Sequence, residues 1–384
     1  MDADEYARCL QGLVAVVSRT DAVGVRAVEE ALQIAMFTVV DIPARRPSDP
    51  EQRIQDALRE LRRSLTAPLQ RFRVFIPVDD VAAAGLPATV GTVQFAVFDE
   101  TLMDQFRQAA TLGVQSKEER EERLKPLDDR QSDQDLAGRT VAIAEVDALE
   151  WGGAQARALQ SIRLVVDAIN FFSDIIPYNQ AHLSLPGDGH QERRAVGQLR
   201  REGDALARHY LGGEWVGGLG DLSLVKLRDP AARHYSTFAH LDRLLQGSRN
   251  TLEDQLIASV QWAGRATVAR RREEAFLLYA IALESFVLAD QDHLELGHRL
   301  RQRVAHLLGK TLEERLRLQK TAGDLYGIRS KIVHSGEYQV SDADFGMMRW
   351  MCKASLLRAC ESEEIRGLSG TDELRQWFDQ LLLR

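Results

Sequence analysis

The segment at residues 273–288 most constrains how this chain can fold, because a helix there would be apolar on nearly every side. Its large apolar residues are spread over the segment and do not form one stripe: Phe276, Leu277, Leu278, Tyr279, Leu283, Phe286 and Val287. A helix that is hydrophobic all round is stable in water only when other elements surround it. The segment therefore predicts the central, buried helix of a helical bundle.

Apolar residues at helical spacing predict the other members of this bundle, from about Tyr235 to the C-terminus. The expected helices cover residues 252–263, 294–308, 312–318 and 324–334, with one beginning at the capping residue Ser341 and a final one capped by Thr371. The carboxy-terminal part of the chain is thus predicted to be all α-helical, with four or more helices.

The first 240 residues have a different pattern, with short stretches in which β-branched and aromatic residues alternate with polar ones. We expect strands at residues 71–78, 89–98, 140–146 and 182–186, and helices at residues 3–40, 51–64, 101–110 and 154–172. The charged stretch at residues 116–135 is expected to be a solvated loop or an exposed helix. The predicted fold class is α+β, with a mixed α/β amino-terminal domain at residues 1–240 and an all-α helical bundle at residues 241–384.

Composition limits the classes of function. The net charge of −8 does not favour nucleic-acid binding by the whole surface, so any such contact would be local. Residues 264–334 hold thirteen Lys and Arg against nine Asp and Glu, a local balance of +4. The three cysteines give neither a disulfide framework nor a CxxC pair. No apolar run reaches the ~20 residues that span a bilayer, and the acidic N-terminus is unlike a signal peptide, so we expect a cytoplasmic protein with no membrane partner.

Three patterns that resemble ligand sites fail on their spacing. Residues 309–311, Gly-Lys-Thr, are similar to the end of a Walker A loop, but Val304 stands where that motif needs its first glycine. Residues 293–298 contain two histidines and a glutamate but lack the HExxH pattern of a zinc-binding helix. The glycines at residues 212–220 match no nucleotide-binding motif and are interpreted as turns in a loop. We therefore expect no cofactor and no metal.

The predicted helix at residues 324–334 carries an arginine and a histidine. An arginine keeps its charge at any physiological pH, whereas a histidine titrates near neutral pH. A pair such as Arg329 and His334 therefore suits the binding of a phosphate and the transfer of a proton beside it. They are five residues apart, which places them about 140° apart around a helix. Spacing alone favours a structural interpretation, in which Arg329 is a surface or capping residue and His334 lies at a helix C-terminus.

Residues 326–334, Tyr-Gly-Ile-Arg-Ser-Lys-Ile-Val-His, resemble the R-x4-6-H motif of HEPN domains, in particular of the Apea-like group. Two upstream segments are also similar to this group. Residues 275–285, Ala-Phe-Leu-Leu-Tyr-Ala-Ile-Ala-Leu-Glu-Ser, resemble its core helix, and residues 303–308, Arg-Val-Ala-His-Leu-Leu, resemble its basic helix. The resemblance covers about residues 250–340, and the chain departs from it with His-Ser-Gly where many members have His-Gly.

The resemblance implies a metal-independent endoribonuclease that acts as a homodimer, with two R-x4-6-H motifs facing one cleft. Arg329 would then bind the scissile phosphate, and His334 would act as general base or acid during attack by the 2′-hydroxyl, leaving a 2′,3′-cyclic phosphate. Supporting roles would fall to Ser330, Glu284, Lys331 and Arg303. Glu284 lies on the nearly all-apolar helix and is costly to bury without a partner, for which Arg329 and Arg303 are the two candidates. Glu284 would then orient the arginine for its role at the site; the alternative is an ion pair with a purely structural role.

The same resemblance implies an RNA substrate, with transfer RNA and phage messenger RNA as two options, and an effector role in antiphage defence or a toxin system. Residues 1–240 would be a sensor or regulatory domain that keeps the effector silent, alone or with a regulatory partner. Two alternatives stay open. The bundle could be a non-catalytic HEPN module for RNA binding or assembly, or the protein could be a ligand-sensing regulator.

Overall fold

The computed structural model describes most of the chain after residue 68. The described residues are 69–111, 114–133, 138–148, 151–173, 182–185, 192–202, 205–216, 222–231, 235–289, 296–335 and 339–382. The helices expected at residues 3–40 and 51–64 lie outside them.

The chain divides into two compact units. The first contains Met1–Ile76 and Ile143–Ile162, and the second contains Pro77–Ala142 and Arg163–Arg384. In the described part of the first unit, a small apolar core joins Phe72, Ala148 and Ala154, with Val74 and Val146 packed against it. A domain boundary at residue 240 stays a prediction.

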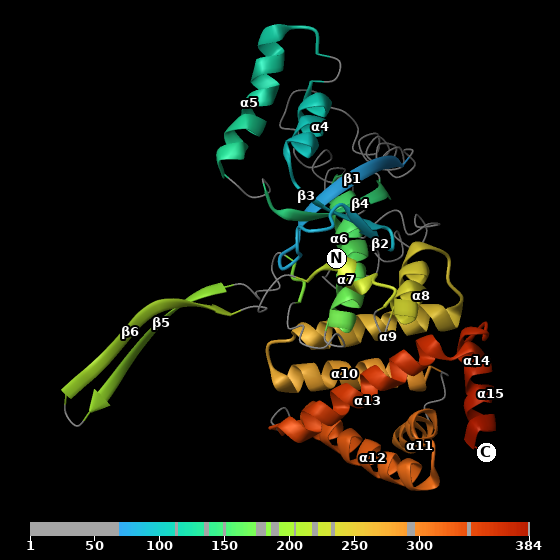
Figure 1. Ribbon diagram of the computed structural model, residues 1–384. Coiled ribbons are helices and arrows are strands. Elements are labelled where there is room, and N and C mark those ends of the chain that lie inside the picture. Colours follow the sequence, from blue (N-terminus) through green and yellow to red (C-terminus); the bar gives the residue numbers. More distant parts are fainter. Residues whose placement is uncertain are drawn as a thin grey trace, which may run out of the picture. The chain divides into compact units, whose positions relative to one another are not determined.

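Four strands form one antiparallel sheet in the order β1-β4-β3-β2 (Figure 1). Their bounds are β1 (Gln70–Pro77), β2 (Ala88–Val90), β3 (Val93–Val97) and β4 (Thr140–Ala148). The strands expected at residues 71–78, 89–98 and 140–146 are confirmed, and the middle stretch divides in two at Gly91. This glycine has φ +57°, and a Cβ there would lie 2.6 Å from the Leu245 Cβ, so no larger residue fits the turn. The stretch at residues 182–186 contributes only an isolated bridge, from Ser184 to Asp79.

Three helices accompany these strands along the chain: α4 (Glu100–Ala110), α5 (Lys117–Asp133) and α6 (Trp151–Ser173). The charged stretch expected as a loop or an exposed helix at residues 116–135 forms helix α5, and the side chains described at residues 117–125 are almost all exposed; residues 134 and 135 lie outside the described residues. A second, two-stranded sheet follows, formed by β5 (Glu192–Glu202) and β6 (Ala205–Val216). The sequence did not predict this hairpin, and the interpretation of Gly212 and Gly213 as turn residues is wrong because both lie inside β6.

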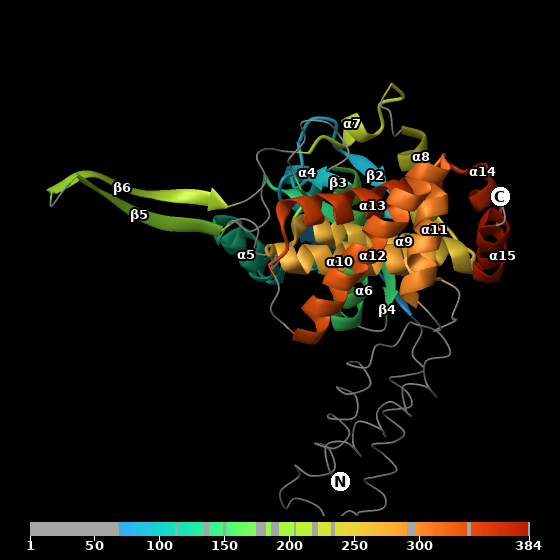
Figure 2. The same cartoon turned by 90° about the horizontal axis from the view of Figure 1, so that it is seen from below.

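The described residues after β6 are largely helical, and the α+β fold class is confirmed. The two helices expected at residues 312–318 and 324–334 are in fact one continuous helix. The helices are α7 (Leu224–Leu227), α8 (Tyr235–Gln246), α9 (Thr251–Val268), α10 (Arg272–Val287), α11 (Leu296–Leu308), α12 (Leu312–Ser335), α13 (Asp342–Glu361), α14 (Glu363–Arg366) and α15 (Thr371–Leu382). Helix α10 packs against α9, α11, α12 and α13 (Figure 2). It is the central helix that its all-round apolar sequence predicts.

The helix starts follow from capping side chains. Residues 309–311 lead into α12, where the Glu314 carboxylate accepts hydrogen bonds from the backbone N–H groups of the second and third of them at 2.8 and 3.2 Å. The Gly-Lys-Thr sequence that is similar to the end of a Walker A loop is therefore the start of a capped helix. Ser341 caps α13 as predicted, with its hydroxyl accepting a hydrogen bond from the Asp344 N–H at 3.1 Å. Thr371, in contrast, is the first residue inside α15 and not the residue before it.

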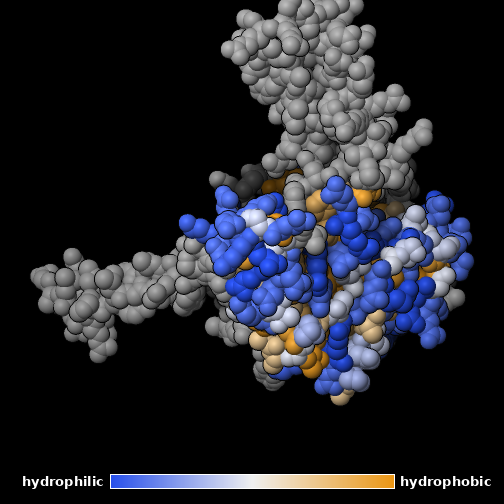
Figure 3. Space-filling model, turned by 90° about the horizontal axis from the view of Figure 1, so that it is seen from above, coloured by the Kyte–Doolittle hydropathy of each residue, from blue (hydrophilic) through white to orange (hydrophobic). Residues whose placement is uncertain are grey.

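The face of the molecule in Figure 3 is mainly hydrophilic, with small hydrophobic areas between charged ones. Exposed large apolar residues among those described include Val225, Leu312, Leu316, Val333 and Trp350. No described helix combines the length and the apolar character needed to cross a membrane.

Candidate functional site

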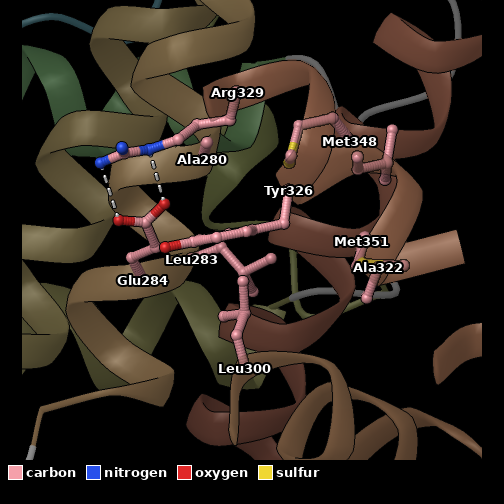
Figure 4. Close-up of a pocket in the computed structure, with 10 residues that line it drawn as sticks. Ala280, Leu283, Glu284, Leu300, Ala322, Tyr326, Arg329, Met348 and Met351 are labelled. Atoms are coloured by element: carbon pink, nitrogen blue, oxygen red, sulfur yellow. Dashed lines mark hydrogen bonds and ion pairs between the residues drawn. The ribbon is translucent and has the colours of Figure 1, made fainter. Parts of the chain in front are cut away.

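Glu284 on α10 and Arg329 on α12 form an ion pair (Figure 4). Arg329 Nη2 donates a hydrogen bond to Glu284 Oε2 at 3.2 Å, and Arg329 Nε lies 3.0 Å from Glu284 Oε1. Both atoms of the second contact are buried, and neither has a hydrogen-bond partner. The second contact is therefore an electrostatic attraction without the alignment of a hydrogen bond. The structure thus brings together two predicted site residues that are 45 positions apart in sequence, and Arg329, not Arg303, is the partner of Glu284.

The pair lies beside a small pocket with apolar walls. Besides Glu284, Tyr326 and Arg329, the lining consists of Ala280, Leu283, Leu300, Ala322, Leu325, Met348 and Met351. Its volume of about 10 Å³ matches roughly one water molecule. The apolar walls lower the local dielectric and leave no room for a bound metabolite, so the chemistry of the site belongs to the charged pair at its edge.

Burial raises the pKa of the Glu284 carboxyl above its usual value, although the charge and hydrogen bond of Arg329 act to lower it. The cost of removing the carboxylate from water is therefore larger than the attraction of the guanidinium. The ion pair therefore stabilises the fold less than its short interatomic distances suggest. A stronger anion that reached Arg329 could displace Glu284 from it.

Tyr326 supports Arg329 from one turn earlier on α12. The Arg329 guanidinium carbon lies 5.9 Å from the centre of the Tyr326 ring, and Figure 4 shows both side chains extending toward Glu284. Gly297 on α11 leaves the space for this ring, because a Cβ there would be 2.9 Å from Tyr326 Cε1. Sequence reasoning did not single out Tyr326 or Gly297. The available signal was the i, i+3 spacing of Tyr326 and Arg329 on one helix.

His334 lies on the same helix, one residue before the end of α12, and its side chain is exposed. It makes no hydrogen bond or ion pair with the residues that the structure describes. Because α12 runs without a break from Arg329 to His334, the two side chains start about 7.5 Å apart along the axis and about 140° apart around it. A single chain therefore does not present both groups on one side of the helix. Ser330 is half-buried and Lys331 is exposed on this last part of α12.

Arg303 has a structural role and is not beside Glu284. Only 3% of Arg303 is exposed. Its Nη1 donates a hydrogen bond at 2.9 Å to the carbonyl of Val287, the last residue of α10, and its guanidinium lies 5.0 Å from the centre of the Phe378 ring. A helix end leaves carbonyl groups without partners, and a buried arginine satisfies one of them here. The contacts of Arg303 thus join α11 to the end of α10 and to α15, and a supporting role in cleavage stays a prediction.

Among the described residues, no group of three or more His, Cys, Asp and Glu side chains is arranged to hold a metal ion. His298 on α11 is one of the two histidines of the pattern at residues 293–298. Its Nδ1 atom lies 3.0 Å from Arg301 Nη2. His293 and Glu295 lie outside the described residues.

Comparison with known proteins does not identify this arrangement. No protein-family model matches the chain, and no curated protein and no solved structure is similar to it at a significant level.

Proposed function

We propose that this chain is a metal-independent endoribonuclease of the HEPN type, built from two copies of the α10–α13 bundle. The observation that carries the proposal is an arginine held at the edge of an apolar pocket, on the same helix as an exposed histidine. Arg329 would bind the scissile phosphate, which competes with Glu284 for the guanidinium. Because Arg329 and His334 diverge around α12, the proposal needs a second copy whose α12 faces the first.

The reaction follows from the two residues. His334 takes the proton of the 2′-hydroxyl as its oxygen attacks the phosphorus, and the bond from phosphorus to the 5′-oxygen breaks. His334, which now carries that proton, donates it to the leaving 5′-oxygen, and Arg329 stabilises the negative charge that develops on the phosphate oxygens. The products are a 2′,3′-cyclic phosphate and a 5′-hydroxyl. The proposed biological role is that of an effector in antiphage defence or a toxin system.

The test is RNA cleavage by the wild type and by His334→Ala, with chemical mapping of the cleaved ends. We expect the variant to lose about 100-fold or more in rate, as is typical for loss of a general acid–base group. His306→Ala on α11 is the matched control, because it removes a histidine from the neighbouring helix. Equal cleavage by the wild type and His334→Ala would refute the assignment.

Mixing of two inactive variants tests the need for a second copy. If each site takes Arg329 from one copy and His334 from the other, a mixture of Arg329→Ala and His334→Ala proteins should regain activity, because each mixed dimer contains one intact site. Failure of the mixture to cleave, with dimers formed, would place both residues of a site in one copy.

One observation favours a second candidate function, a non-catalytic module for assembly. Arg329 already has a carboxylate partner, and an arginine used only for packing would have the same environment. In that case the Arg329→Ala variant would lose stability but would have no cleavage to lose.

A further inference from the structure

Arg301 on α11 has a positive charge that no carboxylate balances in the part of the chain that the structure describes. The side chain is half-buried, and its Nε atom is buried without a hydrogen-bond partner. Its one polar contact among the described residues joins Nη2 to His298 Nδ1 at 3.0 Å. A buried cationic donor that lacks a partner costs free energy, so an arginine in this environment favours the binding of an anion.

His298 adds a second donor beside Arg301. An arginine has donors only, so the Nδ1 atom of His298 accepts the hydrogen bond and the ring carries its proton on Nε2. The His298 side chain is half-buried as well. The two side chains thus offer N–H groups and no charged acceptor. This set of groups suits a phosphate, to which the planar guanidinium of an arginine can donate two parallel hydrogen bonds.

The guanidinium of Arg301 lies at the contact between α11 and α12, two neighbouring helices of the bundle (Figure 1). It lies beside Gly323 of α12: a Cβ at this glycine would be 3.7 Å from Arg301 Cδ and 3.8 Å from Nη1, which is ordinary van der Waals contact. Alanine would therefore fit here and is a better helix former, so packing alone does not require this glycine. Without a side chain, Gly323 leaves this side of the guanidinium uncovered.

Gly323 shares one face of α12 with His334, the proposed general acid–base group. The two residues are separated by three turns, about 16 Å along the helix axis and about 20° around it. Gly327 and Ser330 lie between them on the same face, and no described atom comes within 4 Å of a Cβ built at Gly327. Small residues therefore connect the surroundings of Arg301 to His334, and an extended strand can lie along this face.

We infer that Arg301 and His298 bind a backbone phosphate of the RNA, a few nucleotides from the bond that His334 cuts. The inference deepens the proposed function and rests on it for the choice of RNA and for the role of His334. A stacked strand advances about 3.4 Å per nucleotide, so the separation of about 16 Å corresponds to about five nucleotides. Arg301 thus binds and positions the substrate and takes no part in the chemical step.

The first test measures binding of a labelled single-stranded RNA of about 12 nucleotides, in the full chain with His334→Ala so that the RNA stays intact. In this background, Arg301→Gln should bind about tenfold more weakly, as expected for loss of a charge-assisted contact. The slope of log K against log salt should become shallower by about 0.7, the value for one phosphate of a single strand.

The matched control for this test is Arg317→Gln, which removes the same charge from an exposed side chain of α12 that pairs with Glu313. It should bind like the parent protein. Equal losses in Arg301→Gln and Arg317→Gln would show that only net charge matters and would overturn the inference. Unchanged binding by Arg301→Gln would overturn it as well.

Gly323→Asp tests the same site without a change at Arg301. Its carboxylate would lie within reach of the guanidinium and compete with the phosphate, so binding should weaken about tenfold. Gly323→Ala is the matched control and should bind like the parent, because its Cβ fits at 3.7 Å. In the Arg301→Gln background, Gly323→Asp should cause little further loss. Additive losses, or equal losses with Ala and Asp at position 323, would contradict the inference.

RNAs with a single uncharged methylphosphonate linkage test the position of the phosphate. The linkage about five nucleotides from the cut should weaken binding to the parent about tenfold and have no effect on Arg301→Gln. If no linkage, or every linkage, distinguishes the two proteins, one fixed phosphate site is wrong. Tighter binding of a free 5′-mononucleotide than of RNA through Arg301 would also reject the assignment to an RNA backbone.

Kinetics with His334 present separate this inference from the proposed function. Arg301→Gln should raise KM for the long RNA about tenfold and leave kcat unchanged, and it should cut a dinucleotide at the wild-type rate, because so short a substrate does not reach Arg301. If the wild type cuts no RNA but binds it through Arg301, the proposed function fails and the phosphate site stands. If the wild type cuts RNA and Arg301→Gln matches it in KM, the phosphate site fails and the proposed function stands.

Discussion

The strongest prediction concerns the ion pair between Glu284 and Arg329, because the structure indicates that it is weak despite its contacts at 3.0 and 3.2 Å. We consider two single variants, Glu284→Gln and Arg329→Met, and the double variant. These substitutions keep most of the side-chain volume and remove the charges one at a time. The measured quantity is the free energy of unfolding.

The magnitude follows from burial. Two unit charges about 4 Å apart attract by about 4 kcal/mol at an effective dielectric constant near 20. The pKa of Glu284 is nevertheless raised by burial against the effect of Arg329, so desolvation offsets this attraction. Loss of one partner from a fully buried pair costs about 3–5 kcal/mol, and these side chains are 27% and 21% exposed, so a smaller loss is expected.

We expect Arg329→Met to lose about 2 kcal/mol, because an unpaired carboxylate is left against apolar walls. Glu284→Gln should lose about 1 kcal/mol, since the arginine reaches water more easily. The double variant should lie within about 1 kcal/mol of the wild type, which gives a coupling energy of about 2 kcal/mol.

The pH dependence of Arg329→Met gives an independent check. Without its arginine, the Glu284 carboxyl has a folded-state pKa still further above its unfolded value. The folded state then binds a proton more readily than the unfolded state, so stability should fall as pH rises above 4.5, the ordinary pKa of this carboxyl. Urea unfolding at several pH values measures both effects. Additive single losses, with a coupling energy below about 0.5 kcal/mol, would refute the reasoning.

Three further predictions concern the rest of the described structure. Gly264→Ala should destabilise the protein by about 3 kcal/mol or prevent folding, since its Cβ would lie 1.8 Å from the Asp167 carbonyl oxygen; a thermal melt equal to wild type would contradict this. Burial raises the pKa of Asp167 from 3.8 to about 6, so as pH falls from 7 to 4 the folded state gains up to about 3 kcal/mol of stability from this proton. Asp167→Asn should lack that gain, and denaturation curves that keep the wild-type pH slope would disprove it. Arg303→Met should cost about 2 kcal/mol because the Val287 carbonyl loses its buried donor, whereas exposed Arg317→Met should cost under 0.5 kcal/mol in the same urea titration.

Local sequence determined most of the helical bundle. The all-round apolar pattern of α10 defined the central helix, and Ser341 defined the start of α13, because apolar periodicity and capping depend on residues close in sequence. The hairpin was not predicted, since arginines and glycines interrupt the apolar alternation that marks a strand, and its pairing joins residues up to 24 positions apart, from Glu192 to Val216.

For the candidate site, the sequence determined that Arg329 and His334 share a helix and that Glu284 needed a partner. Only the tertiary structure decided between two arginines. The crossing of α10 and α12 brings Arg329 to Glu284, whereas Arg303 on α11 reaches the end of α10 and the Phe378 ring. The physical reason is that helical periodicity fixes the face on which a side chain lies, but the close packing of helices distant in sequence fixes which side chain it meets.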